Sequence, residues 1–187
     1  MNIILFGPPG AGKGTQSRYL LKKLNCFQIS TGDMLRDEIE KNSKIGKDIT
    51  DNMNEGKFVN DKIVNDLIKD VLFDPPKKNK LIFDGYPRSL SQAKNLDLLL
   101  DSSNQKIDFI FFLNVNKETI IKRIEKRKIL EKRSDDGSNT ILKRYDTYME
   151  TTKPVLDFYS KNPNFYEIDG TLEIDQITSK INDILQV

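Results

Sequence analysis

A glycine-rich segment at residues 7–15, Gly-Pro-Pro-Gly-Ala-Gly-Lys-Gly-Thr, limits the possible folds of this chain more than any other feature. It follows the apolar run 2–6, which predicts a buried strand, and precedes a helical pattern that reaches Leu24. Between a strand and a helix, glycines let successive backbone N–H groups point at one anion, and the helix N-terminus adds positive potential. Lys13 adds a mobile charge for the outer phosphates. The segment therefore predicts a nucleoside triphosphate site, and an ordinary turn is the weaker alternative.

The residue after the lysine departs from the general pattern of phosphate-binding loops. That position usually holds Ser or Thr, whose hydroxyl binds magnesium, but here it is Gly14, and the first hydroxyl belongs to Thr15. We therefore expect Mg²⁺ to be held by phosphates and waters, without a direct ligand from the loop. Asp84 ends the strand-like run 80–83, at the sheet edge where α/β proteins bind ligands. Its carboxylate can orient magnesium waters opposite Lys13, although a role as a turn residue that caps the next helix stays open.

Short apolar runs alternate with longer helical patterns along the chain. Strand-like runs fall at 2–6, 27–29, 80–83, 107–113 and 165–168. This alternation is typical of βα units, so we expect an α/β fold: a five-stranded parallel sheet with helices on both faces. We also expect one helix that begins near Met34, and a longer one from a polar stretch at 134–139 to about Tyr159. No repeat or low-complexity linker divides the sequence, which favours a single domain over 1–187.

The 187 residues include no histidine and one cysteine. This composition excludes a Ser-His-Asp or Cys-His catalytic couple, a zinc site of the Cys/His kind and an intrachain disulfide. Cys26, beside Phe27, favours a buried apolar role and a reducing, cytoplasmic compartment. With 30 Lys and Arg against 28 Asp and Glu, the net charge of +2 does not indicate nucleic acid or membrane partners. No apolar run approaches the roughly 20 residues that span a bilayer.

Arginines recur in and after the predicted turns and helices. They are Arg36, Arg88, Arg123, Arg127, Arg133 and Arg144. Phosphoryl transfer needs cations around a spreading negative charge more than it needs a base, and guanidinium groups bind phosphate oxygens bidentately. Taken singly, each arginine is also compatible with a solvated surface position, and 118–132 with a charged helix face. A nucleic-acid patch at 118–132 is disfavoured because no aromatic residues are interleaved there for base stacking.

Separate motifs follow one another along nearly the whole chain. They are the glycine loop at 7–15, Ser-Thr-Gly-Asp-Met-Leu-Arg at 30–36, Glu-Gly-Lys-Phe-Val at 55–59, Asp-Gly-Tyr-Pro-Arg at 84–88 with Gln92, and the arginine series to Arg144. In this order they resemble the adenylate kinases, within the nucleoside monophosphate kinases, and Gly14-Thr15 is itself similar to that family. The resemblance implies a P-loop nucleoside triphosphate hydrolase-like fold and the reversible reaction ATP + AMP ⇌ 2 ADP, with Mg²⁺ and without zinc.

For the ATP side, the resemblance implies a cradle for the phosphates and contacts to the base. The residues implied are Gly10, Ala11, Gly12, Lys13, Gly14, Thr15, Arg123, Arg127 and Leu172. Lys13 would be central to the transfer, Arg123 would stack on the base, and Arg127 would meet the phosphates. Leu172 would offer only its backbone carbonyl to the base.

For the AMP side, the resemblance implies a larger set. Its members are Thr31, Arg36, Lys57, Phe58, Val59, Gly85, Tyr86, Pro87, Arg88, Gln92, Arg133 and Arg144. Arg36 and Arg88 would grip the phosphate, and Gln92 would read the adenine edge. The catalytic set implied is Lys13, Asp84, Arg88, Arg127, Arg133 and Arg144, with Asp84 positioning magnesium through water.

Two inserted segments are also implied, an AMP-binding lobe at 30–59 and a short lid at 128–138. The lid has no cysteine or histidine and so cannot hold structural zinc, and its stretch 128–132 lacks the glycine common in short lids. Asp135 or Asp136 would help to lock it. We expect a monomer whose partners are ATP, AMP and ADP.

Two other functions compete with this interpretation. The nearest is a UMP/CMP kinase on the same scaffold, which Thr31 and Gln92 disfavour, since the pyrimidine enzymes typically carry Ala in place of Thr31. From another class, the chain could be a nucleotide-binding module without activity. A binding module needs the loop and Lys13 but not a second phosphate site, so the presence of Arg36 and Arg88 disfavours it.

Overall fold

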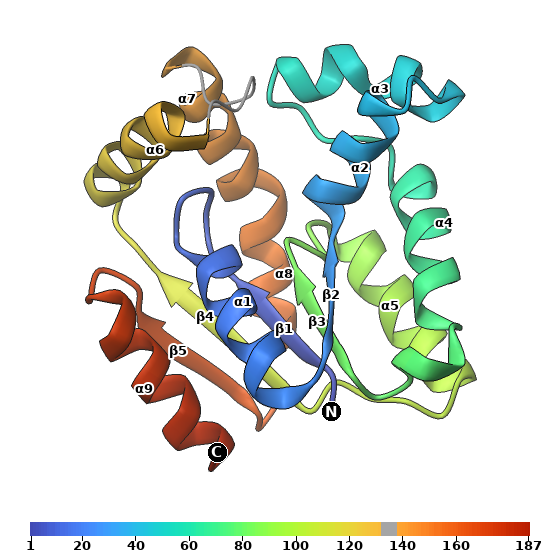
Figure 1. The fold of residues 1–187 in the computed structure, drawn as a ribbon, viewed down its shortest axis with the longest axis vertical. Coiled ribbons are helices and arrows are strands. Elements are labelled where there is room, and N and C mark those ends of the chain that lie inside the picture. Colours follow the sequence, from blue (N-terminus) through green and yellow to red (C-terminus); the bar gives the residue numbers. More distant parts are fainter. Residues whose placement is uncertain (132–137) are drawn as a thin grey trace.

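The computed structural model describes the backbone of residues 1–131 and 138–187 and the side chains of residues 1–128 and 140–187. Its centre is a sheet with the order β2-β3-β1-β4-β5, in which neighbouring strands are parallel (Figure 1). The strands are β1 (Ile3–Phe6), β2 (Phe27–Ser30), β3 (Leu81–Asp84), β4 (Phe109–Asn114) and β5 (Phe165–Asp169). The predicted five-stranded parallel sheet is therefore confirmed.

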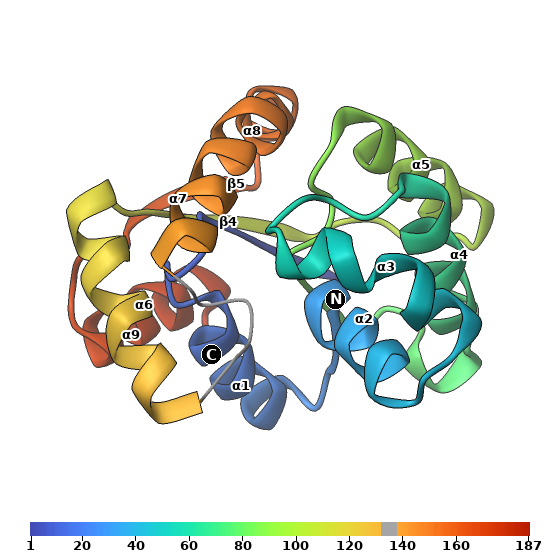
Figure 2. The same ribbon diagram turned by 90° about the horizontal axis from the view of Figure 1, so that it is seen from above.

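Helices cover both faces of the sheet, as predicted (Figure 2). Strand β1 is buried on both faces, which explains why its sequence is an uninterrupted apolar run. Ile3 and Leu5 belong to a core shared with α1 (Lys13–Leu24), α6 (Lys117–Glu131) and α9 (Ile174–Leu185). Ile4 and Phe6 belong to a second core shared with α4 (Asp61–Leu72), α5 (Leu90–Ser102) and α8 (Lys153–Tyr159). Alternate side chains of β1 thus tie the two layers of helices together.

The connections of the sheet create a crevice at its carboxyl edge. The chain crosses from β1 to β2 in one direction and from β3 to β4 in the other, and such a reversal is where α/β sheets bind ligands. Leu5 pairs in register with Asp84, so the loop that follows β1 starts beside the turn that follows β3. The glycine-rich segment and Asp84 therefore lie at the same edge.

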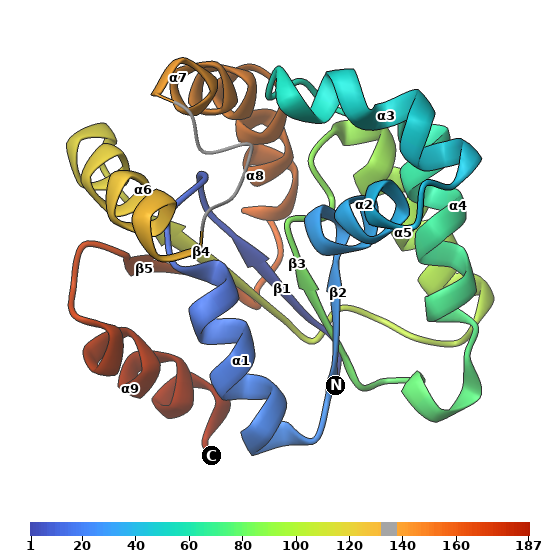
Figure 3. The same cartoon turned by 45° about the horizontal axis from the view of Figure 1, so that its top comes forward.

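Two pairs of helices stand above this edge (Figure 3). One pair is α2 (Thr31–Glu40) and α3 (Lys44–Asn54), and the other is α6 and α7 (Ser138–Thr147). The start of helix α2 was predicted near Met34, but the helix begins three residues earlier, at Thr31. It begins there because the Ser30 Oγ accepts from the Asp33 N–H at 3.3 Å and caps the helix. Helix α3 was not predicted, and α5 was expected only as a helix after Asp84, without bounds. In α3, a Cβ on Gly46 would lie 2.1 Å from the Glu38 carbonyl oxygen, so only glycine permits this contact with α2.

The long helix predicted up to Tyr159 is present but is not uniform. Helix α7 continues into a π-helical turn, η2 (Tyr148–Thr152), and then into α8. Pro154, near the start of α8, has no N–H to donate to the preceding turn, which accounts for the change in hydrogen bonding. A short 3₁₀ turn, η1 (Pro75–Lys77), follows α4.

Cys26 is half-buried and packs against the core beneath α1 and α9, and this burial raises the pKa of its thiol. A raised pKa leaves the thiol protonated, which agrees with the predicted apolar role, although the side chain is half-buried and not fully buried as expected. Across the described residues, no helix is long and apolar enough to cross a membrane.

Asn2 provides a test of how the sheet is held together. Its side chain is fully buried, accepts from the Leu81 N–H at 3.2 Å and donates to the Lys106 carbonyl at 3.0 Å. Asn2→Ala leaves both backbone groups without this partner, so we expect the free energy of unfolding, measured by urea titration, to fall by about 2 kcal/mol. The control Asn114→Ala removes an exposed hydrogen bond to Glu167 and should change stability by about 0.5 kcal/mol or less. Equal effects of the two substitutions would contradict the prediction.

Candidate active site

The glycine-rich loop has a backbone that requires glycine. Gly10 and Gly12 have φ values of 80° and 98°, in the region that side chains disfavour. A Cβ on Gly10 would also lie 2.8 Å from Ile124 of α6, so the loop packs closely against that helix. Helix α1 begins at Lys13 with Gly12 as its N-cap residue. The loop therefore ends on a helix N-terminus, an arrangement suited to binding an anion.

The Lys13 ammonium group lies against the loop itself. It donates to the Gly7 carbonyl at 2.7 Å and to the Pro8 carbonyl at 3.0 Å. These neutral acceptors hold the side chain across the loop, in the position where outer phosphates were predicted. A bound polyphosphate would offer the same ammonium group a charged acceptor, which makes a stronger hydrogen bond.

The electrostatic surroundings of Lys13 are strongly positive. The pKa of Lys13 is lowered to about 8, chiefly by burial of the ammonium group and to a smaller extent by repulsion from Arg88, Arg144 and Arg127. The Asp84 carboxylate opposes this shift in part. Three of the predicted catalytic arginines are therefore close enough to Lys13 to repel its ammonium group, an arrangement that favours a group of high negative charge.

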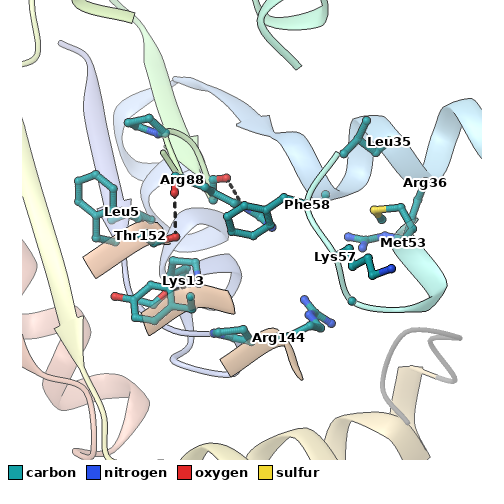
Figure 4. A pocket seen from close by; sticks show the side chains of 18 residues that line it. Leu5, Lys13, Leu35, Arg36, Met53, Lys57, Phe58, Arg88, Arg144 and Thr152 are labelled. Atoms are coloured by element: carbon teal, nitrogen blue, oxygen red, sulfur yellow. Dashed lines mark hydrogen bonds between the residues drawn. The ribbon is translucent and has the colours of Figure 1, made fainter. Parts of the chain in front are cut away.

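A pocket opens beside Lys13 (Figure 4). It is lined by cations from five parts of the chain: Lys13 of α1, Arg36 of α2, Lys57 from the loop after α3, Arg88 from the turn after β3, and Arg144 of α7. Apolar side chains, among them Leu35, Met53 and Phe58, line it as well, and Phe58 lies beside Arg88. A pocket lined by cations and apolar side chains suits a nucleotide, which has an anionic and an aromatic part.

Arg88 is held in place by several contacts. Its Nε donates to the Gly85 carbonyl at 2.6 Å, and its guanidinium lies 5.6 Å from the centre of the Phe58 ring. Its own carbonyl accepts from the Thr152 hydroxyl at 3.1 Å. Arg36 forms an ion pair with Asp33, one turn earlier on α2. Both arginines predicted to grip the acceptor phosphate thus reach the same pocket.

Some residues predicted for the AMP side lie behind the pocket wall. Thr31 is 4% exposed and donates to the Gly85 carbonyl at 2.8 Å. Val59 and Gln92 are also buried, and none of these three side chains lines the pocket. Lys57 and Phe58, which precede Val59, do line it.

The residues predicted for the ATP base lie on the far side of the glycine loop. Arg123 donates to the Gly170 carbonyl at 2.8 Å, to the Ala11 carbonyl at 3.4 Å and to the Leu172 carbonyl at 3.4 Å. Arg123 therefore joins the glycine loop to the loop after β5, and it brings Leu172 to the site. Arg127 follows one turn later on α6 and acts on Lys13 through its charge.

Asp84 offers one carboxylate for magnesium. Its Oδ2 accepts from Gln28 at 3.0 Å and would lie 3.4 Å from a Cβ on Gly14, so it faces the start of α1. In the described part of the chain, no group of three or more His, Cys, Asp or Glu side chains could hold a metal ion. A single carboxylate fits Mg²⁺, because this ion keeps several waters and shares the phosphates of its substrate.

Sequence reasoning missed several contributors. Met53 and Tyr148 line the pocket, Thr152 holds Arg88, and Asp61 accepts from Gln92 at 2.7 Å. No motif marks these residues, since their contacts arise only from the fold. Three predicted residues lie outside the described side chains, namely Arg133, Asp135 and Asp136.

Comparison with known proteins agrees with this geometry. A family model described as adenylate kinase matches residues 5–164. An adenylate kinase of Pelagibacter ubique is 50% identical, with all of both chains covered. Adenylate kinases of Mycoplasma mycoides and of a Caulobacter species are 40% and 38% identical, over all of this chain and 100% and 99% of their own length. The chain belongs to the adenylate kinase family.

Proposed function

We propose that this chain catalyses reversible phosphoryl transfer from ATP to AMP, which gives two molecules of ADP. The observation that carries the proposal is the meeting of two phosphate-binding regions in one place. The charges of Arg88 and Arg144 lower the pKa of Lys13 of the glycine loop, and all three side chains line one pocket. A protein that only binds one nucleotide needs the loop but not this second set of cations. The membership of the adenylate kinase family supports the same function.

On the donor side, the loop from Gly10 to Thr15 would hold the phosphates of ATP. Lys13 would exchange its two loop carbonyls for phosphate oxygens, and Arg127 would add a second charge. Arg123 and the Leu172 carbonyl would meet the base. The contact of Arg123 with both loops supports this assignment.

On the acceptor side, Arg36 and Arg88 would bind the phosphate of AMP, while Arg133 and Arg144 would close over the transferring group. The base of AMP would lie against the apolar side chains that line the pocket. The other acceptor residues of the proposal are Thr31, Lys57, Phe58, Val59, Gly85, Tyr86, Pro87 and Gln92. The pocket between α2, α7 and the turn after β3 supports this placement.

Bound Mg²⁺ would neutralise charge on the phosphates, and Asp84 would hold its water ligands. The transfer itself needs no covalent intermediate and no general base, because positioning and charge stabilisation supply the catalysis. We assign the chain to one domain, with the lobe 30–59 and the lid 128–138 as insertions that close over the substrates. Closure would exclude water and so suppress hydrolysis of ATP.

The proposal extends to partners and place of action. The net charge of +2 supports small nucleotides as partners, without nucleic acid or membrane. The single cysteine supports the reducing cytoplasm, and the proposed form is a monomer.

Acceptor preference tests the proposed reaction. Initial rates with ATP and each of AMP, CMP, UMP and GMP, followed as ADP formation, should show AMP as the best acceptor by about tenfold or more, because a site built to bond one base edge rejects the others. A pyrimidine preference would replace the proposal by a UMP/CMP kinase. Binding of ATP without ADP formation would replace it by a binding module.

Arg88→Ala tests the acceptor site. We expect kcat to fall about a hundredfold or more, because the variant loses a cation at the developing charge, while the thermal unfolding curve keeps its shape. Arg18→Ala, on the exposed side of α1, is the control and should keep full activity. A rate near that of the unmodified protein in Arg88→Ala would remove Arg88 from the site.

The lowered pKa of Lys13 predicts proton uptake on ATP binding. The free ammonium group loses its proton near pH 8, and bound phosphates raise its pKa because they favour the charged form. Between pH 8 and 9, ATP binding should therefore take up a proton, and little should be taken up at pH 7. Calorimetry in two buffers of different ionisation enthalpy measures this uptake. Lys13→Arg stays charged throughout, so the same uptake in this variant would contradict the assignment.

A further inference from the structure

The carboxamide of Gln92 is held at both of its ends. Its Oε1 accepts from the Arg88 backbone N–H at 2.7 Å, and its Nε2 donates to the Asp61 Oδ1 at 2.7 Å. The side chain is only 3% exposed, so these two contacts are made away from water. The short pattern Ser89-x-x-Gln92 is typical of a capping box, but the carboxamide bonds Arg88 and Asp61 instead.

Asp61 is itself fixed by the start of α5. Its Oδ2 accepts from the Ser89 hydroxyl at 2.8 Å, and the Ser89 Oγ accepts from the Gln92 backbone N–H at 3.1 Å as the cap of this helix. Asp61 is the first residue of α4, two positions after Val59. One half-buried carboxylate thus connects the end of the proposed AMP lobe to the residue proposed to read the base.

These contacts determine which end of the carboxamide is oxygen and which is nitrogen. An ionised carboxylate only accepts hydrogen bonds, and a backbone N–H only donates. Turning the carboxamide over would set the Gln92 oxygen against Asp61 and its NH₂ group against the Arg88 N–H. Both contacts would become repulsive, at a site where lost hydrogen bonds are costly.

The orientation has a consequence for base recognition. Within the described contacts, the Gln92 carboxamide still has one N–H and one oxygen lone pair to offer. Adenine presents an acceptor at N1 and a donor at N6, which a carboxamide bonds in one orientation. A 6-oxopurine presents a donor at N1 and an acceptor at O6, which requires the opposite orientation.

We propose that Asp61 is a positioning residue for specificity: by fixing the orientation of the Gln92 carboxamide, it makes the acceptor site select adenine over 6-oxopurine monophosphates. The inference rests on the proposed function, in which Gln92 reads the acceptor base. It assigns the discrimination to a carboxylate that, like Gln92, does not line the pocket in this structure.

Asp61→Asn tests this role with little change of shape. An amide at position 61 accepts or donates, so only the Arg88 N–H would still favour one orientation of the Gln92 carboxamide. We expect the ratio of kcat/KM for AMP to kcat/KM for inosine monophosphate to fall about tenfold. This is the discrimination that one bidentate contact to a base edge provides. The matched control is Asp66→Asn, an exposed position on the same helix, which should leave the ratio unchanged.

A purely structural role for Asp61 gives a different result. If the carboxylate only supports α5, Asp61→Asn lowers kcat/KM equally for both acceptors, whatever the change in melting temperature, and the proposal is overturned. An unchanged ratio overturns it as well. In a double-mutant cycle with Gln92→Ala, Asp61→Asn should have no further effect on the ratio, because the group through which it acts is gone. Additive effects of the two substitutions would contradict the inference that Asp61 acts through Gln92.

The same assays separate this inference from the proposed function. If the unmodified protein forms ADP from ATP and AMP but the ratio is unchanged in Asp61→Asn, only the inference is rejected. An unmodified protein that forms no ADP from these substrates rejects the proposed function, and the inference with it.

Discussion

Repulsion between cationic side chains is the constraint on which the rest of this structure depends. Lys13, Arg88, Arg127 and Arg144 come from four different elements, and the three arginines all lower the pKa of the lysine. The Asp84 carboxylate offsets part of this repulsion, and the remainder costs free energy. Two apolar cores, one on each face of the sheet, offset that cost by holding the elements that carry the charges. The two cores therefore stabilise the arrangement of the charged side chains, and a bound anion would reduce the repulsion between them.

The carboxyl edge of the sheet explains how these cationic side chains meet, although they lie far apart in the sequence. The register of Leu5 with Asp84 places the glycine loop beside the turn that carries Arg88. Arg123 then joins the glycine loop to the loop after β5. Each cation sits at the end of a strand or on a helix whose other side is buried. Leu35 of α2 and Ile141 of α7 belong to the two cores, so these cores also hold Arg36 and Arg144 at the pocket.

The part of the site that depends on local sequence could be predicted. The glycine loop, Asp84 and the turn before Arg88 are read from consecutive residues, because backbone conformation and strand ends are local properties. The five strands followed from the alternation of apolar runs. Contacts such as that of Asp61 with Gln92, or of Thr152 with Arg88, join positions 31 and 64 residues apart, so no local pattern reveals them. Helix α3 was missed for a similar reason, since its packing on α2 depends on the close approach at Gly46.

The π-helical turn between α7 and α8 fixes the rotational phase of one helix against the other. A π turn holds one residue more than an α-helical turn, and each residue rotates an α-helix by about 100°. This extra residue lets α7 carry Arg144 to the pocket while α8 keeps Val155 and Leu156 in the core. Deleting one residue within Tyr148–Thr152 would turn one of these faces out of place. Length changes in this segment are therefore compatible with the site only when they preserve that phase.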